Sequence, residues 1–345
     1  MLLDLIYGKY KTVSIVGLAK NTGKTVALNH IIQEAAGRDM VLGLISTGRD
    51  GEAIDLITEK EKPQIYVEAG SIIATTSLLL PLAEATIEII KATEHRTPLG
   101  EVVIGRVIDG GYVQIGGPQT AAGIREVVNT ILGLGADLVL IDGAMDRRAS
   151  AAPSISQATI LSTGAVLSRD MDRVIEETLH MVNLFSLPAI EDYREREIIK
   201  RAFMKGQVAI MDKGLNIAPI PIKTPLNSGT IIGNHIKDDT KYLLIPSSLA
   251  TSTVEGIINS GGEYRNIYIV VADGTKIFIP CQEWLKFMQQ AVKVKVLNPI
   301  NIVAITINPY SPEGYYFDPK EFLDKTRYYI EDIPVVDLML GVNWG

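Results

Sequence analysis

The stretch that decides the fold is TVSIVGLAKNTGKT, residues 12 to 25. Its first five residues are β-branched, small or apolar, which is typical of a buried β-strand. A loop with two glycines follows, and the apolar spacing of GKTVALNHIIQEAAG (residues 23 to 37) predicts a helix that ends near Gly37. The order strand, glycine-containing loop, helix indicates an α/β fold built on parallel strands.

This loop has the composition of a phosphate-binding site. Backbone N–H groups at a helix start attract an anion, and a glycine lets the backbone approach phosphate closely. Lys24 is expected to reach the β- and γ-phosphates, and the Thr25 hydroxyl is expected to bind Mg²⁺. We therefore expect ATP and Mg²⁺ as cofactors. The residues expected to contact the nucleotide are Gly17, Lys20, Asn21, Thr22, Gly23, Lys24, Thr25 and Val26. The alternative is a chance Gly-Lys-Thr at a helix start.

The spacing of the loop departs from the common pattern, in which four residues separate the first glycine from Gly-Lys. Five residues separate Gly17 from Gly23. Either the loop is one residue longer than usual, or Leu18 begins a loop of ordinary length.

Two acidic residues follow predicted strands and are candidates for the metal site. Asp142 ends the strand-like ADLVLID, and Asp50 lies in STGRDGE after the second predicted strand. Because the carboxyl ends of parallel strands form one ligand crevice, both should lie on the side of the phosphate loop. We therefore expect Mg²⁺ to be held by Thr25, Asp50 and Asp142, and catalysis to depend on Lys24 and Asp50. The alternatives are an Asp-Gly turn at Asp142 and a solvated loop acid at Asp50.

Alternating strand and helix patterns predict a first domain over residues 1 to 190, an α/β unit with a P-loop NTPase-type, mainly parallel sheet and helices on both faces. Its further strands are expected at residues 41–45, 101–107, 137–141 and 158–161, and its further helices at 121–132 and 170–185. A charged helical run at 191–205 predicts the start of a second, smaller α/β domain over residues 191 to 345, which offers a surface for a partner. Its strands are expected at 241–245, 266–271, 276–279 and 301–307, its helices at 282–292 and 319–329, and a turn at 308–315 that is also a common location for a binding loop.

Composition narrows the functional classes. The 345 residues carry a formal net charge of −7 and no basic stripe, which argues against nucleic-acid binding. The single cysteine, Cys281, excludes an intramolecular disulfide. The longest apolar stretch, residues 71 to 83, contains Pro81 and is too short to span a bilayer. The first residues lack a small-residue cleavage site, so we expect a cytoplasmic protein without membrane contact.

The longer loop resembles that of dethiobiotin synthetase and the cobyrinic acid amide synthases. That branch of P-loop proteins includes dimerising ATPases with a second lysine, whose position here is Ala19, with Lys20 one place later. The resemblance allows a homodimer across the nucleotide face, and the departure at Ala19 leaves lysine chemistry between protomers in doubt.

A wider resemblance covers most of the chain. It is carried by STGRDGE, KPQIYVEAGSIIAT, GGPQTAAGIREV, GADLVLIDGAMDRRASAAP, ATILSTGAVLSRDM and AITINPYSPEGYYFDP. Together these segments resemble the small, KamB-type subunit of the lysine aminomutase reactivase. The resemblance implies an ATPase that works beside a MutS-like ATPase subunit to reactivate an adenosylcobalamin-dependent aminomutase.

Two other functions fit the same nucleotide loop. One is an ATP-dependent ligase of the dethiobiotin synthetase kind, which phosphorylates a small carboxylate. The other is a nucleotide-binding sensor without turnover. The base preference between ATP and GTP is left open by the sequence.

Overall fold

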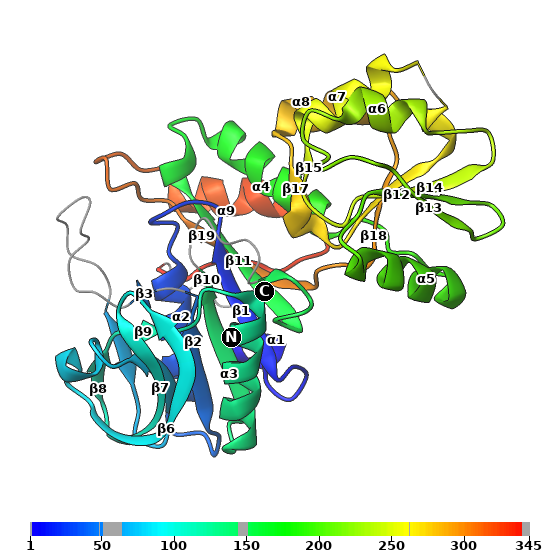
Figure 1. Cartoon of the computed structure of the whole chain (residues 1–345). Helices are drawn as coiled ribbons and strands as arrows, with labels where there is room; N and C mark the ends of the chain where they lie inside the picture. Colours follow the sequence, from blue (N-terminus) through cyan, green and yellow to red (C-terminus); the bar gives the residue numbers. More distant parts are fainter. Residues whose placement is uncertain (1, 48, 51–63, 144–150, 262, 340–345) are drawn as a thin grey trace. The chain divides into compact units, whose positions relative to one another are not determined.

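The computed structural model describes residues 2–47, 49–50, 64–143, 151–261 and 263–339 (Figure 1). The chain divides into two compact units. The first consists of Met1–Leu179 and Asn301–Gly345, and the second of His180–Ile300.

Nine strands of the described residues form the main sheet of the first unit. In spatial order they are β20 (Val335–Asp337), β19 (Ile302–Asn308), β11 (Ala158–Gly164), β1 (Thr12–Gly17), β10 (Leu138–Gly143), β2 (Leu42–Ser46), β5 (Ile72–Thr76), β7 (Gly100–Asp109) and β6 (Thr86–Thr97). Pairing is parallel from β20 to β5 and antiparallel for β5 with β7 and β7 with β6. The prediction of an α/β fold with a mainly parallel sheet is confirmed.

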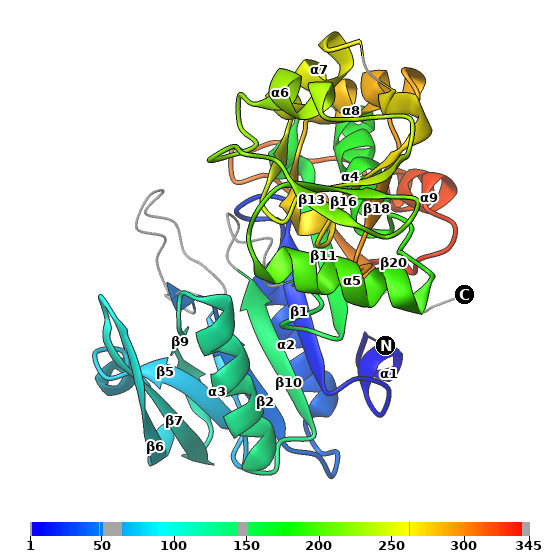
Figure 2. The ribbon, with the colours of Figure 1, turned by 45° about the vertical axis from the view of Figure 1, so that its right-hand side comes forward.

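Helices cover both faces of this sheet because its central strands are apolar on both sides. Leu138 and Leu140 of β10 belong to one buried cluster, with residues of α1 (Leu2–Ile6) and α2 (Lys24–Ala35). Val139 and Ile141 belong to another cluster, with residues of α3 (Ala121–Gly133). Alternate residues of a strand point to opposite faces, so one strand supports both layers (Figures 1 and 2).

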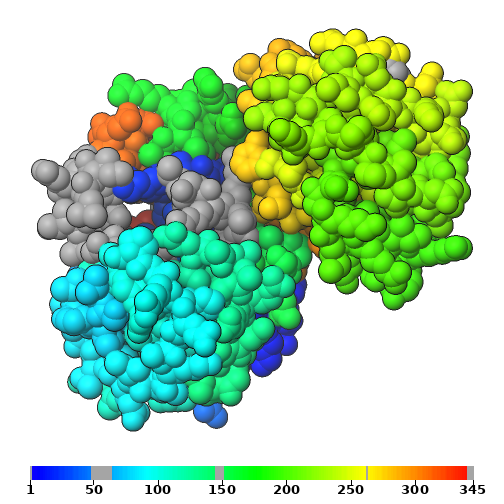
Figure 3. Space-filling model, viewed as in Figure 1, coloured from blue at the N-terminus to red at the C-terminus, as the bar shows by residue number. Residues whose placement is uncertain are grey.

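The antiparallel edge of the sheet was not predicted. β6 is the outermost strand there, and its long, largely exposed course is part of the surface drawn in cyan in Figure 3.

Two short antiparallel pairs are β3 (Arg49–Asp50) with β9 (Ile115–Gly116), and β4 (Ile65–Val67) with β8 (Gly111–Val113). The described part of the first unit also contains α9 (Pro319–Tyr329) and the start of α4 (Met171–Phe185). The last residues of α4 belong to the second unit.

The second unit has its own sheet and core. Its strands run in the order β13 (Ile217–Pro219), β12 (Ala209–Asp212), β14 (Thr240–Leu244), β16 (Tyr268–Val271) and β18 (Val294–Val296), with β15 (Leu249–Ala250) paired to β17 (Ile277–Phe278). Its helices are α5 (Tyr193–Met204), α6 (Gly229–Asn234), α7 (Thr251–Asn259) and α8 (Cys281–Gln289). Ile199 of α5 packs with Leu244 and Val270 in one buried cluster.

The predicted division into residues 1–190 and 191–345 is corrected by the course of the chain. Residues 301 onward return to the first unit, because β19 pairs in parallel with β11, with Leu161 opposite Ile305. β20 then adds to the outer side of β19. The second unit, which begins within α4, is therefore an insertion before β19 of the first.

None of the helices in the described part of the chain is long and apolar enough to cross a membrane.

Candidate functional site

The loop that joins β1 to α2 folds tightly on itself. The N–H of Leu18 donates to the carbonyl of Ser162 on the neighbouring strand at 2.9 Å. The buried Thr22 hydroxyl donates to the carbonyl of Ala19 at 3.0 Å. A Cβ at Gly17 would lie 2.5 Å from that hydroxyl and 3.0 Å from Cδ of Lys24. The first residue of the loop must therefore be glycine, and the Lys24 side chain lies back over it.

The backbone of this loop has a run of N–H groups that no hydrogen bond within the described residues uses. Asn21 and Gly23 have left-handed φ angles of 64° and 93°, and α2 begins at Lys24 without a side-chain cap. Among the described residues, no hydrogen-bond acceptor is found for the backbone N–H groups of residues 21 to 26. Alternation of left- and right-handed backbone turns successive N–H groups to one side, which makes a concave anion site. The helix N-terminus adds partial positive charge at the same point.

Asn308, at the end of β19, holds the loop from the other side. Its side-chain amide donates to the carbonyl of Asn21 at 3.1 Å. Its backbone carbonyl approaches Gly164 so closely that a Cβ there would lie 2.5 Å from the oxygen. Sequence reasoning assigned residues 308 to 315 to a turn and did not single out Asn308. Only the pairing of β19 with β11 brings it to the loop.

Asp142 lies on the strand next to the one that leads into the loop. In the parallel register it is opposite Ile15 of β1 and Ser46 of β2, and it is 1% exposed. Its backbone carbonyl accepts the N–H of Thr47 at 2.9 Å. The carboxyl ends of β1, β2 and β10 thus meet at one edge of the sheet, and Asp142 lies at that edge.

Asp50 can be placed by its backbone alone. It lies on β3 and pairs with Ile115 of β9, beyond the end of β2, while its side chain lies outside the described residues. The predicted ligands Thr25 and Asp142 supply hydroxyl and carboxylate oxygens, the donors that Mg²⁺ prefers. In the part of the chain that the structure describes, no group of three or more His, Cys, Asp or Glu side chains could hold a metal ion. A magnesium ion bound by two protein oxygens and by phosphate does not need such a group.

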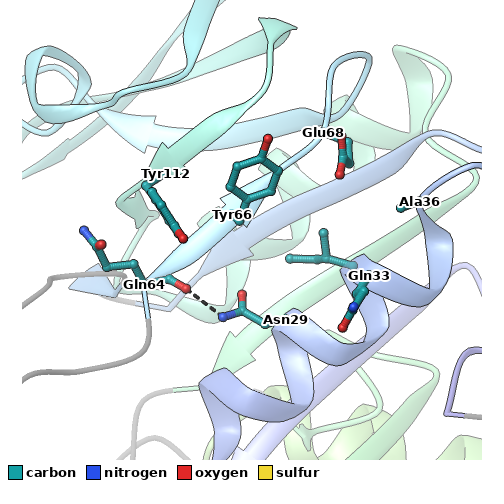
Figure 4. Close-up of a pocket in the computed structure, with 8 residues that line it drawn as sticks. Asn29, Gln33, Ala36, Gln64, Tyr66, Glu68 and Tyr112 are labelled. Carbon is teal, nitrogen blue, oxygen red and sulfur yellow. Dashed lines mark hydrogen bonds between the residues drawn. The ribbon is translucent and has the colours of Figure 1, made fainter.

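A cavity of about 430 Å³ lies beside α2, further along the helix from the loop. It is lined by Asn29, Ile32, Gln33, Ala36, Gln64, Tyr66, Glu68 and Tyr112. Figure 4 shows Asn29 and Gln33 of α2 across from Tyr66 of β4 and Tyr112 of β8. Sequence reasoning missed this cavity, because its walls come from elements that are distant in the chain.

Comparisons of the chain with protein-family models, curated proteins and solved structures found no match.

Proposed function

We propose that this chain binds Mg-ATP through the loop from Gly17 to Thr25 and hydrolyses it. The observation that carries the proposal is the run of backbone N–H groups from residue 21 to residue 26, at the start of α2, for which the described part of the chain offers no acceptor. Such a run is costly unless water or an anion accepts it. A triphosphate supplies several oxygens at the spacing of successive N–H groups.

Each side chain of the site then has a distinct role. Lys24, which lies over Gly17, would pair with the β- and γ-phosphates and stabilise charge in the transition state. Thr25 and Asp142 would hold Mg²⁺, which neutralises phosphate charge when bound. Lys20, Asn21, Thr22, Gly23 and Val26 contribute mainly backbone contacts. Asp50 is proposed as the acid that orients the attacking water.

The role of hydrolysis is proposed from the resemblance to the lysine aminomutase reactivase. On that proposal the chain is a P-loop ATPase subunit that works in the cytoplasm with a MutS-like subunit. Together they would restore an adenosylcobalamin-dependent aminomutase. A chaperone-like ATPase of this kind changes loop order when the γ-phosphate leaves, and its turnover is slow without its partner.

The test is nucleotide binding and phosphate release by the purified chain with Mg-ATP. Lys24→Ala should lose binding, whereas Lys91→Ala, on the exposed edge strand β6, should keep it. Phosphate release should be slow alone and rise when a MutS-like subunit or an aminomutase is added. Wild-type binding that Lys24→Ala does not weaken would refute the assignment of the loop.

Two other results would replace the reactivase proposal. Stimulation by a small carboxylate, with formation of a product, would identify a ligase. Tight binding without turnover under any condition would identify a sensor. The cavity beside α2 gives no support to the ligase, because its described lining residues include Glu68 and no Lys, Arg or His.

A further inference from the structure

The cavity beside α2 is a separate feature from the phosphate loop. Thr25 and Asn29 lie one helical turn apart on the same face of α2, about 6 Å along the axis. From Asn29 the cavity continues along the helix to Ala36. Its opposite wall is formed by β4 and β8, where Tyr66 and Tyr112 are cross-strand partners. Its volume of about 430 Å³ is within the range of small-molecule sites.

Asn29 presents an acceptor that the described residues leave unused. Its Nδ2 donates to the carbonyl of Gln64 at 2.6 Å, which fixes the orientation of the carboxamide. Its Oδ1 is buried and has no hydrogen-bond partner among the described residues. Figure 4 shows this oxygen on the cavity side of the carboxamide. Because buried acceptors are almost always paired, an N–H or O–H donor on a ligand would complete the site.

The rest of the lining favours a positive charge. Tyr66 and Tyr112 form an edge-to-face pair with ring centroids 5.4 Å apart, and they are about two-fifths exposed, at 41% and 40%. Aromatic faces at such a mouth attract an ammonium group. Glu68 adds a carboxylate at the exposed rim, and none of the described residues that line the cavity is Lys, Arg or His. Ile32 and Ala36 supply an apolar surface for a hydrocarbon body.

We propose that this cavity binds a small organic cation, a primary ammonium carried on an aliphatic or aromatic body. The ammonium donates to Asn29 Oδ1 and lies near Glu68 and the tyrosine rings. The hydrocarbon body lies against Ile32 and Ala36. An anion is disfavoured, because it would meet Glu68 and the unpaired carboxamide oxygen without a compensating cation among the described residues.

The experiment compares three probes of one shape and different charge on the wild-type chain without nucleotide. They are 2-phenylethylammonium, 2-phenylethanol and phenylacetate, with binding followed by calorimetry or by ligand-observed NMR. The ammonium should bind at least about tenfold more tightly than phenylacetate, as a charge-assisted hydrogen bond would give. Equal binding of the three probes, preference for the carboxylate, or no binding at millimolar concentrations would each overturn the proposal.

Two variants locate the probe in the cavity. Asn29→Ala should weaken ammonium binding about tenfold, since it removes the buried acceptor. Glu68→Gln, at the exposed rim, should weaken it about two- to fivefold, with a loss that shrinks in salt. Glu88→Gln on β6 is the matched control and should change nothing. Binding that neither Asn29→Ala nor Glu68→Gln weakens would contradict the assignment.

The nucleotide site gives an independent control. Lys24→Ala should lose ATP binding and keep ammonium binding, because Lys24 does not line the cavity. The proposal of ATP binding at the loop and the proposal of ammonium binding in the cavity can therefore be refuted independently. Loss of ammonium binding in Lys24→Ala, with the fold retained by circular dichroism, would show that the cation binds at the phosphate loop instead.

Discussion

The side-chain amide of Asn308 donates a hydrogen bond of 3.1 Å to the backbone carbonyl of Asn21, 287 residues earlier in the chain. Asn21 is the loop residue with the left-handed φ of 64°. Because its carbonyl is held from β19, the peptide after Asn21 is fixed in one orientation within the loop. The last third of the chain thus contributes to a loop in its first tenth.

Replacement of Asn308 by Ala should weaken Mg-ATP binding without unfolding the chain. Loss of one neutral hydrogen bond costs about 0.5–1.5 kcal/mol, which corresponds to an increase in Kd of about two- to tenfold. Calorimetric titration measures the change. Asn266→Ala is the control, because Asn266 is an exposed residue of the second unit whose side chain donates to Glu263. Equal Kd values for the two variants would show that Asn308 does not hold the loop.

Gly17→Ala should abolish nucleotide binding. The new methyl group would lie 2.5 Å from the Thr22 hydroxyl and 3.0 Å from the carbonyl of Ala19, so the loop itself would have to move. The matched control is Gly133→Ala near the end of α3, where a Cβ meets no atom within 4 Å. That change should keep binding and stabilise the fold by up to about 1 kcal/mol, since alanine favours the helix. Fluorescent-nucleotide titration and thermal unfolding report the two effects. Normal binding by Gly17→Ala would show that the loop is not so tightly packed.

Glu195 should matter to the stability of the second unit. This buried carboxylate of α5 accepts a 2.8 Å hydrogen bond from the Tyr242 hydroxyl and pairs with Lys241 of β14. Burial, and then the bond to Glu195, raises the pKa of Tyr242 above its ordinary value, so the tyrosine remains a donor even in alkaline solution. Glu195→Ala removes the acceptor of the buried Tyr242 hydroxyl and the counter-ion of Lys241, and the free energy of unfolding should fall by about 1–3 kcal/mol.

Urea unfolding measures that change, and Glu197→Ala on the same helix serves as its control. Glu197 makes a solvent-exposed pair with Lys200 at 3.7 Å, and pairs of that kind contribute little. A larger loss for Glu197→Ala than for Glu195→Ala would reverse the assigned roles.

The carboxyl group of Asp212 should titrate at unusually low pH. The Asn216 side-chain amide donates to it at 2.9 Å and so lowers its pKa, and the Asn216 backbone N–H adds to the effect. A lowered folded-state pKa stabilises the fold above the unfolded-state pKa, and this stabilisation is lost as pH falls through the folded-state value. Asn216→Ala should raise the pKa toward its ordinary value, as followed by carboxyl ¹³C shifts. An unchanged titration midpoint would exclude the Asn216 side chain as the cause.

Much of the first unit could be predicted from local sequence, because its strands and helices repeat their patterns within a few residues. The strand at Thr12–Gly17, the helix from Lys24 and the helix from Ala121 lie where their apolar spacing predicted them. Gly37, expected at the helix end, has a left-handed φ of 76° just after the cap at Ala36. Such features depend on neighbours in the chain.

The features that were missed depend on distant pairings. The sequence of β6 mixes polar and apolar residues because the strand lies at an exposed edge of the sheet. Only its pairing with β7 identifies it as a strand. The pairing of β19 with β11 could not be predicted from the residues of β19. A buried strand has the same apolar pattern whichever unit it belongs to. For the same reason Asn308 and the cavity beside Asn29 could not be found before the strands were placed.

Because the second unit is inserted in the first, it is synthesised before the first unit is complete. As the chain leaves the ribosome, residues 180 to 300 emerge before β19 and β20, which complete the main sheet. Until then β11 is an open edge with unsatisfied hydrogen-bonding groups, and Asn21 has no Asn308 to fix it. The contact that fixes the loop from Gly17 to Thr25 is therefore among the last that the growing chain can form.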